Sequence, residues 1–268
     1  MISKRPIHLL FKGTSLCLLL ILMACKKDPV NTNTDPTPTP EAKGKLNLEF
    51  IAKVDTARLA FNKLYINLNG DSLMVTKFNY FISNIVLTRS DNSVYTESES
   101  YHLVRHTSAT SFTLPLSNVP VGNYKFISFM LGVDSTRNVS GTQSGDLDPV
   151  NVSDMFWSWN TGYIFLKLEG TAGRVPTSDK KFQFHIGGYG GINKTQRRFN
   201  LSFGSATANV KETATPLVQF NVDVNEIFTY PNKLDFKTQY NILNQGTTAK
   251  MVADNYADMI RFNLVQNN

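Results

Sequence analysis

Hydrophobic and polar residues alternate with a period of two along much of the chain after residue 45. Successive side chains of a β-strand point to opposite faces, so this pattern is typical of strands with one buried face. Such segments occupy residues 46–50, 64–68, 112–116, 182–186 and 199–203. In the second segment Leu64, Ile66 and Leu68 alternate with Tyr65 and Asn67, so we expect the three aliphatic residues to face the core.

Two other segments, residues 78–87 and 163–168, are apolar at nearly every position, which is typical of central strands covered on both sides. Stretches rich in Gly, Asn and Asp separate the segments and predict turns. A helical spacing occurs in residues 248–260, where Met251, Tyr256 and Met259 share one stripe. We therefore predict an all-β fold, a Greek-key β-sandwich of immunoglobulin-like architecture with one short helix near the C-terminus.

The N-terminus has the pattern of an export signal. Three basic residues, Lys4, Arg5 and Lys12, precede an apolar run at residues 15–24 that is too short for a stable membrane-spanning helix. The run ends in Leu-Met-Ala-Cys, which resembles the lipobox of bacterial lipoproteins. We expect a signal peptide at residues 1–24 and a lipid on Cys25. The alternative is an ordinary secretory peptide with an incidental cysteine.

Residues 25–44 are rich in Pro, Thr and Asn and lack apolar periodicity, so we expect a disordered tether. Lys26-Lys27-Asp28 resembles the short charged signal of some Bacteroidetes lipoproteins that are displayed on the outer face. Residues 45–268 are predicted to form one domain. The localisation expected is the cell envelope, with lipid anchoring to the outer membrane on its periplasmic or surface face.

Composition removes several classes of function. The two cysteines, Cys17 and Cys25, leave none for a disulfide after residue 25. The formal charge is +6, but 3 of the 27 basic residues and no acidic residue precede Cys25, so 24 basic and 21 acidic residues leave +3. Nucleic acid is therefore not an expected partner. No nucleophile and base can be assigned, so no enzyme is expected.

Metal ligands are the main candidate chemistry. His102 and His106 are four residues apart, but the surrounding sequence is typical of a strand that runs into a polar loop. His185 alternates with apolar neighbours and precedes glycines, which suits either a strand histidine or a ligand. Carboxylates between residues 146 and 154 suit either a Ca²⁺ loop or a solvated turn, and their spacing differs from an EF-hand.

An aromatic segment offers a different kind of site. Trp157 and Trp159 are two residues apart, so in a strand they share a face, and Tyr163 follows. These three side chains either pack in the core or form an exposed binding face for a sugar.

Five segments, residues 78–85, 120–124, 131–134, 155–163 and 182–187, together resemble the MbnP-like family, named for a methanobactin-associated copper-binding protein. The resemblance implies a β-sandwich envelope domain. In some members it implies copper bound by histidines together with a tryptophan oxidised by a dihaem peroxidase-like partner. His185 matches a family histidine, whereas Phe81-Ile82-Ser83 replaces an aromatic-x-His pattern. Trp157 and Trp159 match family tryptophans that we interpret as structural.

Two hypotheses follow. In the first, the protein is a membrane-anchored binding protein with copper as cofactor, held by His185 together with His102 or His106. In the second, it is a metal-free surface lipoprotein that binds glycan or a protein partner through Trp157, Trp159 and Tyr163.

Overall fold

The computed structural model describes residues 41–106, 111–139, 143–157, 159 and 162–268, apart from the side chain of residue 111. The predicted signal peptide, Cys25 and most of the predicted tether lie outside these residues. The first strand starts at Lys43, two residues before the expected start of the domain. Within the described part of the chain, no helix has the length and apolar character needed to cross a membrane.

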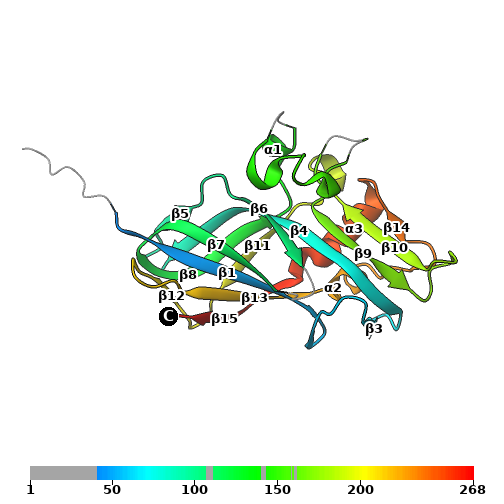
Figure 1. The fold of residues 1–268 in the computed structure, drawn as a ribbon, viewed down its shortest axis with the longest axis horizontal. Coiled ribbons are helices and arrows are strands. Elements are labelled where there is room, and N and C mark those ends of the chain that lie inside the picture. The colour runs from blue at the N-terminus through cyan, green and yellow to red at the C-terminus, as the bar shows by residue number, and fades with distance from the viewer. Residues whose placement is uncertain (1–40, 107–110, 140–142, 158, 160–161) are drawn as a thin grey trace, which may run out of the picture. The chain divides into compact units, whose positions relative to one another are not determined.

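One sheet has five strands in the order β15–β13–β1–β2, with β7 also paired to β1 (Figure 1). The pair β1–β13 is parallel, and the other pairs are antiparallel. Its strands are β1 Lys43–Val54, β2 Ala57–Arg58, β7 Ser111–Pro120, β13 Leu217–Asp223 and β15 Ile260–Gln266.

The second sheet has ten strands, with β11–β8–β4–β9–β10–β14 as its main order. The long strand β4 pairs with β3, β5, β6, β8 and β9, which confirms residues 78–87 as a central strand. The strands are β3 Leu64–Ile66, β4 Ser72–Arg89, β5 Val94–Thr96, β6 Tyr101–His106, β8 Gly122–Leu131, β9 Leu166–Ala172, β10 Lys181–Ile186, β11 Arg197–Ser202, β12 Ala208–Val210 and β14 Asn241–Ile242.

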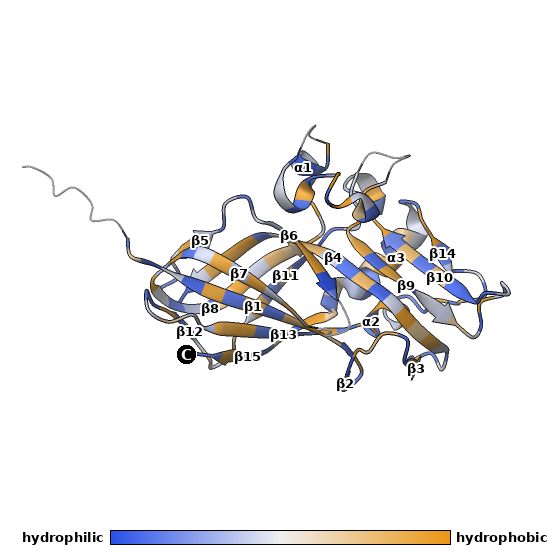
Figure 2. Cartoon of the chain, viewed as in Figure 1, coloured by the Kyte–Doolittle hydropathy of each residue, from blue (hydrophilic) through white to orange (hydrophobic). Residues whose placement is uncertain are grey.

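An aromatic cluster joins the two sheets. Phe50 on β1 stacks on Phe220 of the same sheet, with ring centroids 5.2 Å apart. Across the interface Phe50 meets Tyr80 at 6.3 Å and Phe129 at 6.0 Å, both edge-on. All four rings are fully buried, and the alternation of apolar and polar residues along these strands is visible in Figure 2. The predicted all-β sandwich is thus confirmed.

The inner face of β10 packs against helical segments instead of the smaller sheet. Phe182 and Phe184 contact Phe228 on α2 (Glu226–Thr229) and Phe236 beyond it, with ring centroids 5.1 to 6.3 Å apart. The predicted C-terminal helix is α3 (Thr247–Asn255), followed by a 3₁₀ turn, η4 (Tyr256–Asp258).

The buried stripe of α3 differs in part from the predicted one. Ala249, Val252 and Ala253 are buried on α3, and Tyr256 and Met259 after it are fully buried as expected. Met251 is only half-buried. Met251 directly precedes Val252 in the sequence and so lies at the edge of the buried stripe, near the surface.

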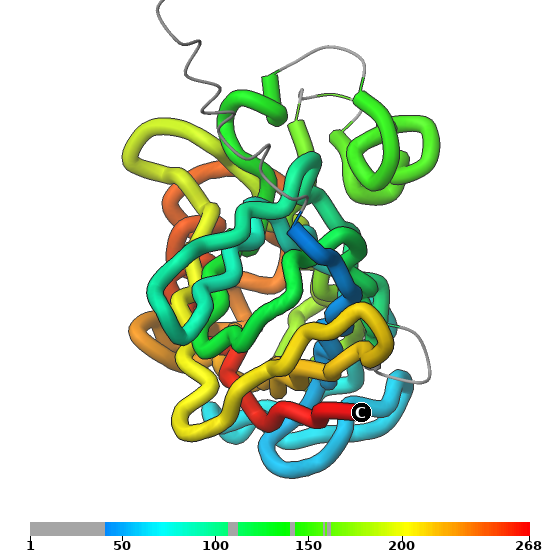
Figure 3. The backbone as a smooth tube through the Cα atoms, turned by 90° about the vertical axis from the view of Figure 1, so that its left-hand side faces the viewer, coloured from blue at the N-terminus to red at the C-terminus, as the bar shows by residue number. Residues whose placement is uncertain are grey.

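The short helical segments between β8 and β9 stand beside the strands in both views (Figures 1 and 3). They are α1 (Ser135–Val139), η1 (Gly145–Leu147) and η2 (Ser153–Met155). Trp157 and Trp159 follow η2 outside any strand, so the strand expected around them is absent from the described residues.

The predicted orientation of β3 is wrong. Leu64, Ile66 and Leu68 are 63%, 61% and 68% exposed, while Tyr65 and Asn67 are buried. The Tyr65 hydroxyl accepts a hydrogen bond from the Ala60 N–H at 2.7 Å. The Asn67 side-chain oxygen accepts two turn N–H groups at 2.8 and 3.0 Å. The Tyr65 hydroxyl and the Asn67 side-chain oxygen thus have local partners, which lowers the cost of burying these two side chains while the aliphatic side chains face solvent.

Candidate functional site

His185 lies on β10, where Phe182, Phe184 and Ile186 are fully buried and the alternate residues face outward. Its Nε2 lies 2.7 Å from Oε1 of Glu169 on the neighbouring strand β9. This hydrogen bond to His185 holds the pKa of Glu169 below its usual value. The imidazole is therefore already bound to a carboxylate.

The other two histidines lie on β6 and also have partners. Nε2 of His102 is 2.8 Å from Oε2 of Glu97. His106 is buried, stacks on Phe78 with ring centroids 5.1 Å apart, and places Nε2 3.2 Å from the Tyr80 hydroxyl. Burial raises the pKa of that hydroxyl well above its usual value. His106 is a packed core residue.

The sheet register separates His185 from the β6 histidines. His185 is in line with Lys167, Asn79 and Arg105, so His185 and Arg105 are three strand spacings of about 4.8 Å apart, or about 14 Å. One residue further along these strands, His106 is in line with Phe184. Because side chains alternate between the two faces, His106 lies on the face opposite to His185. His102 shares the His106 face because the two are four residues apart in one strand.

The expected pairing of His185 with His102 or His106 therefore does not occur. Copper–nitrogen and zinc–nitrogen bonds are only about 2 Å long, so residues on opposite faces of a sheet cannot share an ion. Among the described residues, no group of three His, Cys, Asp or Glu side chains converges on a metal position.

A charged cluster of Arg105, Asp154 and Lys167, here called the latch, lies on the same outer face as His185. Arg105 donates two hydrogen bonds to the Asp154 carboxylate at 2.8 and 2.7 Å, which holds the pKa of Asp154 below its usual value. Lys167 is buried on β9 and donates to the Asp154 backbone carbonyl, and burial lowers its pKa. The latch fixes η2 on the sheet. The sequence does not reveal this cluster, because Lys167 lies within an apolar run.

The carboxylates of the β8–β9 connection serve separate roles. Asp146 accepts the Leu103 N–H at 2.7 Å, and Asp148 accepts the Val150 N–H at 2.9 Å. Asp154 belongs to the latch. Asp148 is bound within its own turn, whereas Asp146 and Asp154 are bound to groups on β6, and among the described residues the three carboxylates do not converge as a Ca²⁺ loop requires.

The three residues of the predicted aromatic face, Trp157, Trp159 and Tyr163, differ in their exposure to solvent. Trp157 and Tyr163 are buried, and the Tyr163 hydroxyl donates to the Leu147 carbonyl. Trp159 is 61% exposed and lies 5.7 Å from Trp157 between ring centroids. A Cβ at Gly187 would lie 2.6 Å from the Trp157 ring, so this glycine makes room for Trp157. Only Trp159 of the three can contact a partner directly.

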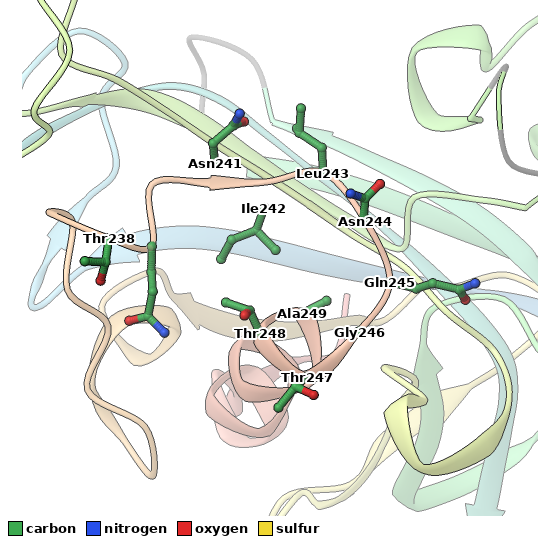
Figure 4. A pocket seen from close by; sticks show the side chains of 11 residues that line it. Thr238, Asn241, Ile242, Leu243, Asn244, Gln245, Gly246, Thr247, Thr248 and Ala249 are labelled. Atoms are coloured by element: carbon green, nitrogen blue, oxygen red, sulfur yellow. The ribbon is translucent and has the colours of Figure 1, made fainter.

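A hollow of about 250 Å³ lies between β14 and the start of α3, and none of the predicted site residues lines it. Figure 4 shows Ile242 and Thr248 directed into it from its two sides. Its other polar lining includes Gln239, Asn241, Asn244, Gln245 and Thr247. No charged side chain lines it, so its side chains offer only neutral amide and hydroxyl groups for hydrogen bonds. The sequence carries no motif there.

These observations define the class of protein: an all-β domain of two packed sheets in which His102 and His185, on opposite faces of one sheet, are each paired with a glutamate. The model of the MbnP family matches residues 43–249, and the chain therefore belongs to the MbnP family. A solved structure, MbnP from Methylosinus trichosporium, has the same fold, with a TM-score of 0.53 and 10% identity. The similarity covers 84% of this chain and 99% of that one. No curated protein matches the chain.

Proposed function

We propose that the protein is a lipid-anchored binding protein of the bacterial cell envelope that works without a two-histidine copper centre. The anchor is inferred from the sequence, where the apolar run ends at Cys25 in a lipobox-like pattern. A durable attachment needs more than one acyl chain, which lipoproteins supply at the N-terminal cysteine. The Pro-rich tether then separates the domain from the membrane.

One observation carries the metal-free part of the proposal. His102 and His185 lie on opposite faces of the sheet, and each is hydrogen-bonded to a glutamate. A selective copper site needs several nitrogen or sulfur ligands in fixed geometry. His185 with Glu169 supplies one imidazole and one carboxylate, which is a weak ligand set. We therefore assign the His185–Glu169 pair to sheet stability.

The binding surface is assigned to the β8–β9 connection, where Trp159 is exposed. An exposed tryptophan offers a large apolar contact and an N–H donor, which suits either a sugar ring or a protein partner. The dihaem peroxidase-like partner implied by the family remains a prediction.

A copper titration tests the metal-free assignment. The mature protein carrying Cys25→Ser, which keeps it in solution, is titrated with Cu beside the same protein with His185→Ala and with His102→Ala. We expect equal, weak affinity in all three. A loss of affinity in His185→Ala alone would overturn the assignment and make His185 a copper ligand.

Membrane anchoring is tested separately by cell fractionation. The unaltered protein is expected in the membrane fraction and Cys25→Ser in the soluble fraction. Mass spectrometry of the native N-terminus should show an acylated cysteine, and cleavage at another residue would contradict the anchor.

A further inference from the structure

A hollow of about 380 Å³ lies on the outer side of β8 and β11, separate from Trp159 and from the histidines. Met130 on β8, Tyr189 and Gln196 line it. Two cationic side chains, Lys194 and Arg198, also line it.

These cations differ from their neighbour Arg197. Arg197 forms an ion pair with Asp254, which also receives Lys250 at 2.5 Å. Within the described residues, neither Lys194 nor Arg198 forms an ion pair. Arg198 makes one long hydrogen bond, 3.4 Å to the Ser128 hydroxyl. Lys194 and Arg198 therefore line the hollow as cations without an ion-pair partner among the described residues.

The one carboxylate in the lining, Asp134, is occupied by other groups. It accepts the Tyr101 hydroxyl at 2.5 Å, the Asn84 amide at 3.3 Å and the Arg137 N–H at 3.1 Å. Burial alone would raise the pKa of Asp134, but these hydrogen bonds outweigh it and hold the pKa below its usual value. With two cations and one anion, the lining carries a net charge of +1.

The backbone that carries the two cations is fixed before any ligand binds. The Thr195 N–H and hydroxyl both donate to the Gly188 carbonyl, at 2.9 and 3.1 Å. The Gln196 amide bridges the Val133 and Tyr189 carbonyls at 3.1 and 3.3 Å. A ligand would therefore order only the ends of Lys194 and Arg198, which lowers the entropic cost of binding.

We infer that this hollow is a binding site for a small ligand bearing an oxyanion, either a phosphate or a carboxylate, held by Arg198 and Lys194. The planar guanidinium donates two parallel hydrogen bonds to such a group, and the ammonium adds a third charge-assisted one. Tyr189 and Met130 supply apolar surface for the rest of the ligand. The inference does not depend on the anchor or on the absence of copper.

The test uses the mature protein with Cys25→Ser and three probes: inorganic phosphate, acetate, and vesicles of phosphatidylcholine with phosphatidylglycerol. Amide NMR shifts of residues 188–198 report binding of the soluble probes, and sedimentation reports the vesicles. We expect phosphate and acetate to shift these amides, with affinity at least about tenfold weaker in Lys194→Ala/Arg198→Ala. Lys125→Ala is the matched control, because it removes an exposed cation from β8 outside the hollow.

The outcomes separate the sources of the anion. Binding of phosphate or acetate without vesicle sedimentation supports a free soluble ligand, and sedimentation lost in the double variant supports a lipid headgroup. Equal affinity in the double variant and the control, or no shift with either soluble probe at millimolar concentration together with no sedimentation, would overturn the inference.

Discussion

The imidazole of His185 is hydrogen-bonded to the carboxylate of Glu169, with 2.7 Å between Nε2 and Oε1. The two residues face outward from adjacent antiparallel strands, β10 and β9, and both side chains are about four-fifths covered. Cross-strand pairs of this kind stabilise a sheet, and here the pair engages Nε2 of the imidazole. This contact supports the structural role that we propose for the family-matching histidine.

Glu169→Gln is expected to lower the free energy of unfolding by about 1 kcal/mol at pH 7. The hydrogen bond from His185 lowers the folded-state pKa of Glu169 below 4.5. Its contribution is thus fully present above pH 4.5 and is lost as the pH falls through the folded pKa. Urea unfolding of both proteins between pH 3 and pH 7 checks this. A difference that stays constant down to pH 3 would contradict it.

The latch between Arg105 and Asp154 should show measurable but modest coupling. A double-mutant cycle with Arg105→Gln and Asp154→Asn is expected to give about 0.5–1 kcal/mol, since both side chains are 37% exposed and water screens the pair. Loss of the latch should also speed hydrogen exchange at the η2 amides. Additive single effects would show that η2 is held by packing alone.

Gly187→Ala is expected to destabilise the domain by about 1–3 kcal/mol, because the new Cβ would lie 2.5 Å from the Tyr163 carbonyl and 2.6 Å from the Trp157 ring. Gly190→Ala is the matched control. Nothing lies within 4 Å of its Cβ position, so its stability should change by less than about 0.5 kcal/mol. Thermal unfolding followed by near-ultraviolet circular dichroism measures both variants.

Strand β3 offers a prediction opposite to the one that its sequence pattern suggests. Ile66→Thr should leave stability within about 0.5 kcal/mol, because Ile66 is 61% exposed. Tyr65→Ala should cost about 3 kcal/mol, since it removes a buried ring and the partner of the Ala60 N–H. Urea denaturation would contradict the structure if the two effects were reversed.

The sequence predicts most of the fold because the apolar alternation of strands such as β10 is strong and local. It misorients β3, since Tyr65 and Asn67 are buried through hydrogen bonds to backbone groups that no periodicity reveals. The candidate site is harder to predict. Whether His102 and His185 share a face depends on the register across β6, β4, β9 and β10, which is a long-range property.

The family resemblance is carried by local motifs and is confirmed by the match to the MbnP model. The exposure of Trp157 and Trp159 could not follow from those motifs. It depends on where η2 is latched and on the space left at Gly187, both set by residues distant in sequence.

Fluorescence quenching distinguishes the two tryptophans, which are the only two in the sequence. Trp159 is 61% exposed and Trp157 is 5% exposed, so acrylamide should quench two populations, one readily and one poorly. In Trp159→Phe the readily quenched population should disappear while the free energy of unfolding changes by less than about 0.5 kcal/mol. Trp157→Phe should instead retain ready quenching and lose about 1–3 kcal/mol, because the smaller ring leaves space beside Gly187. If Trp159→Phe leaves strong quenching, Trp157 is accessible, and the aromatic face predicted from the sequence would be restored.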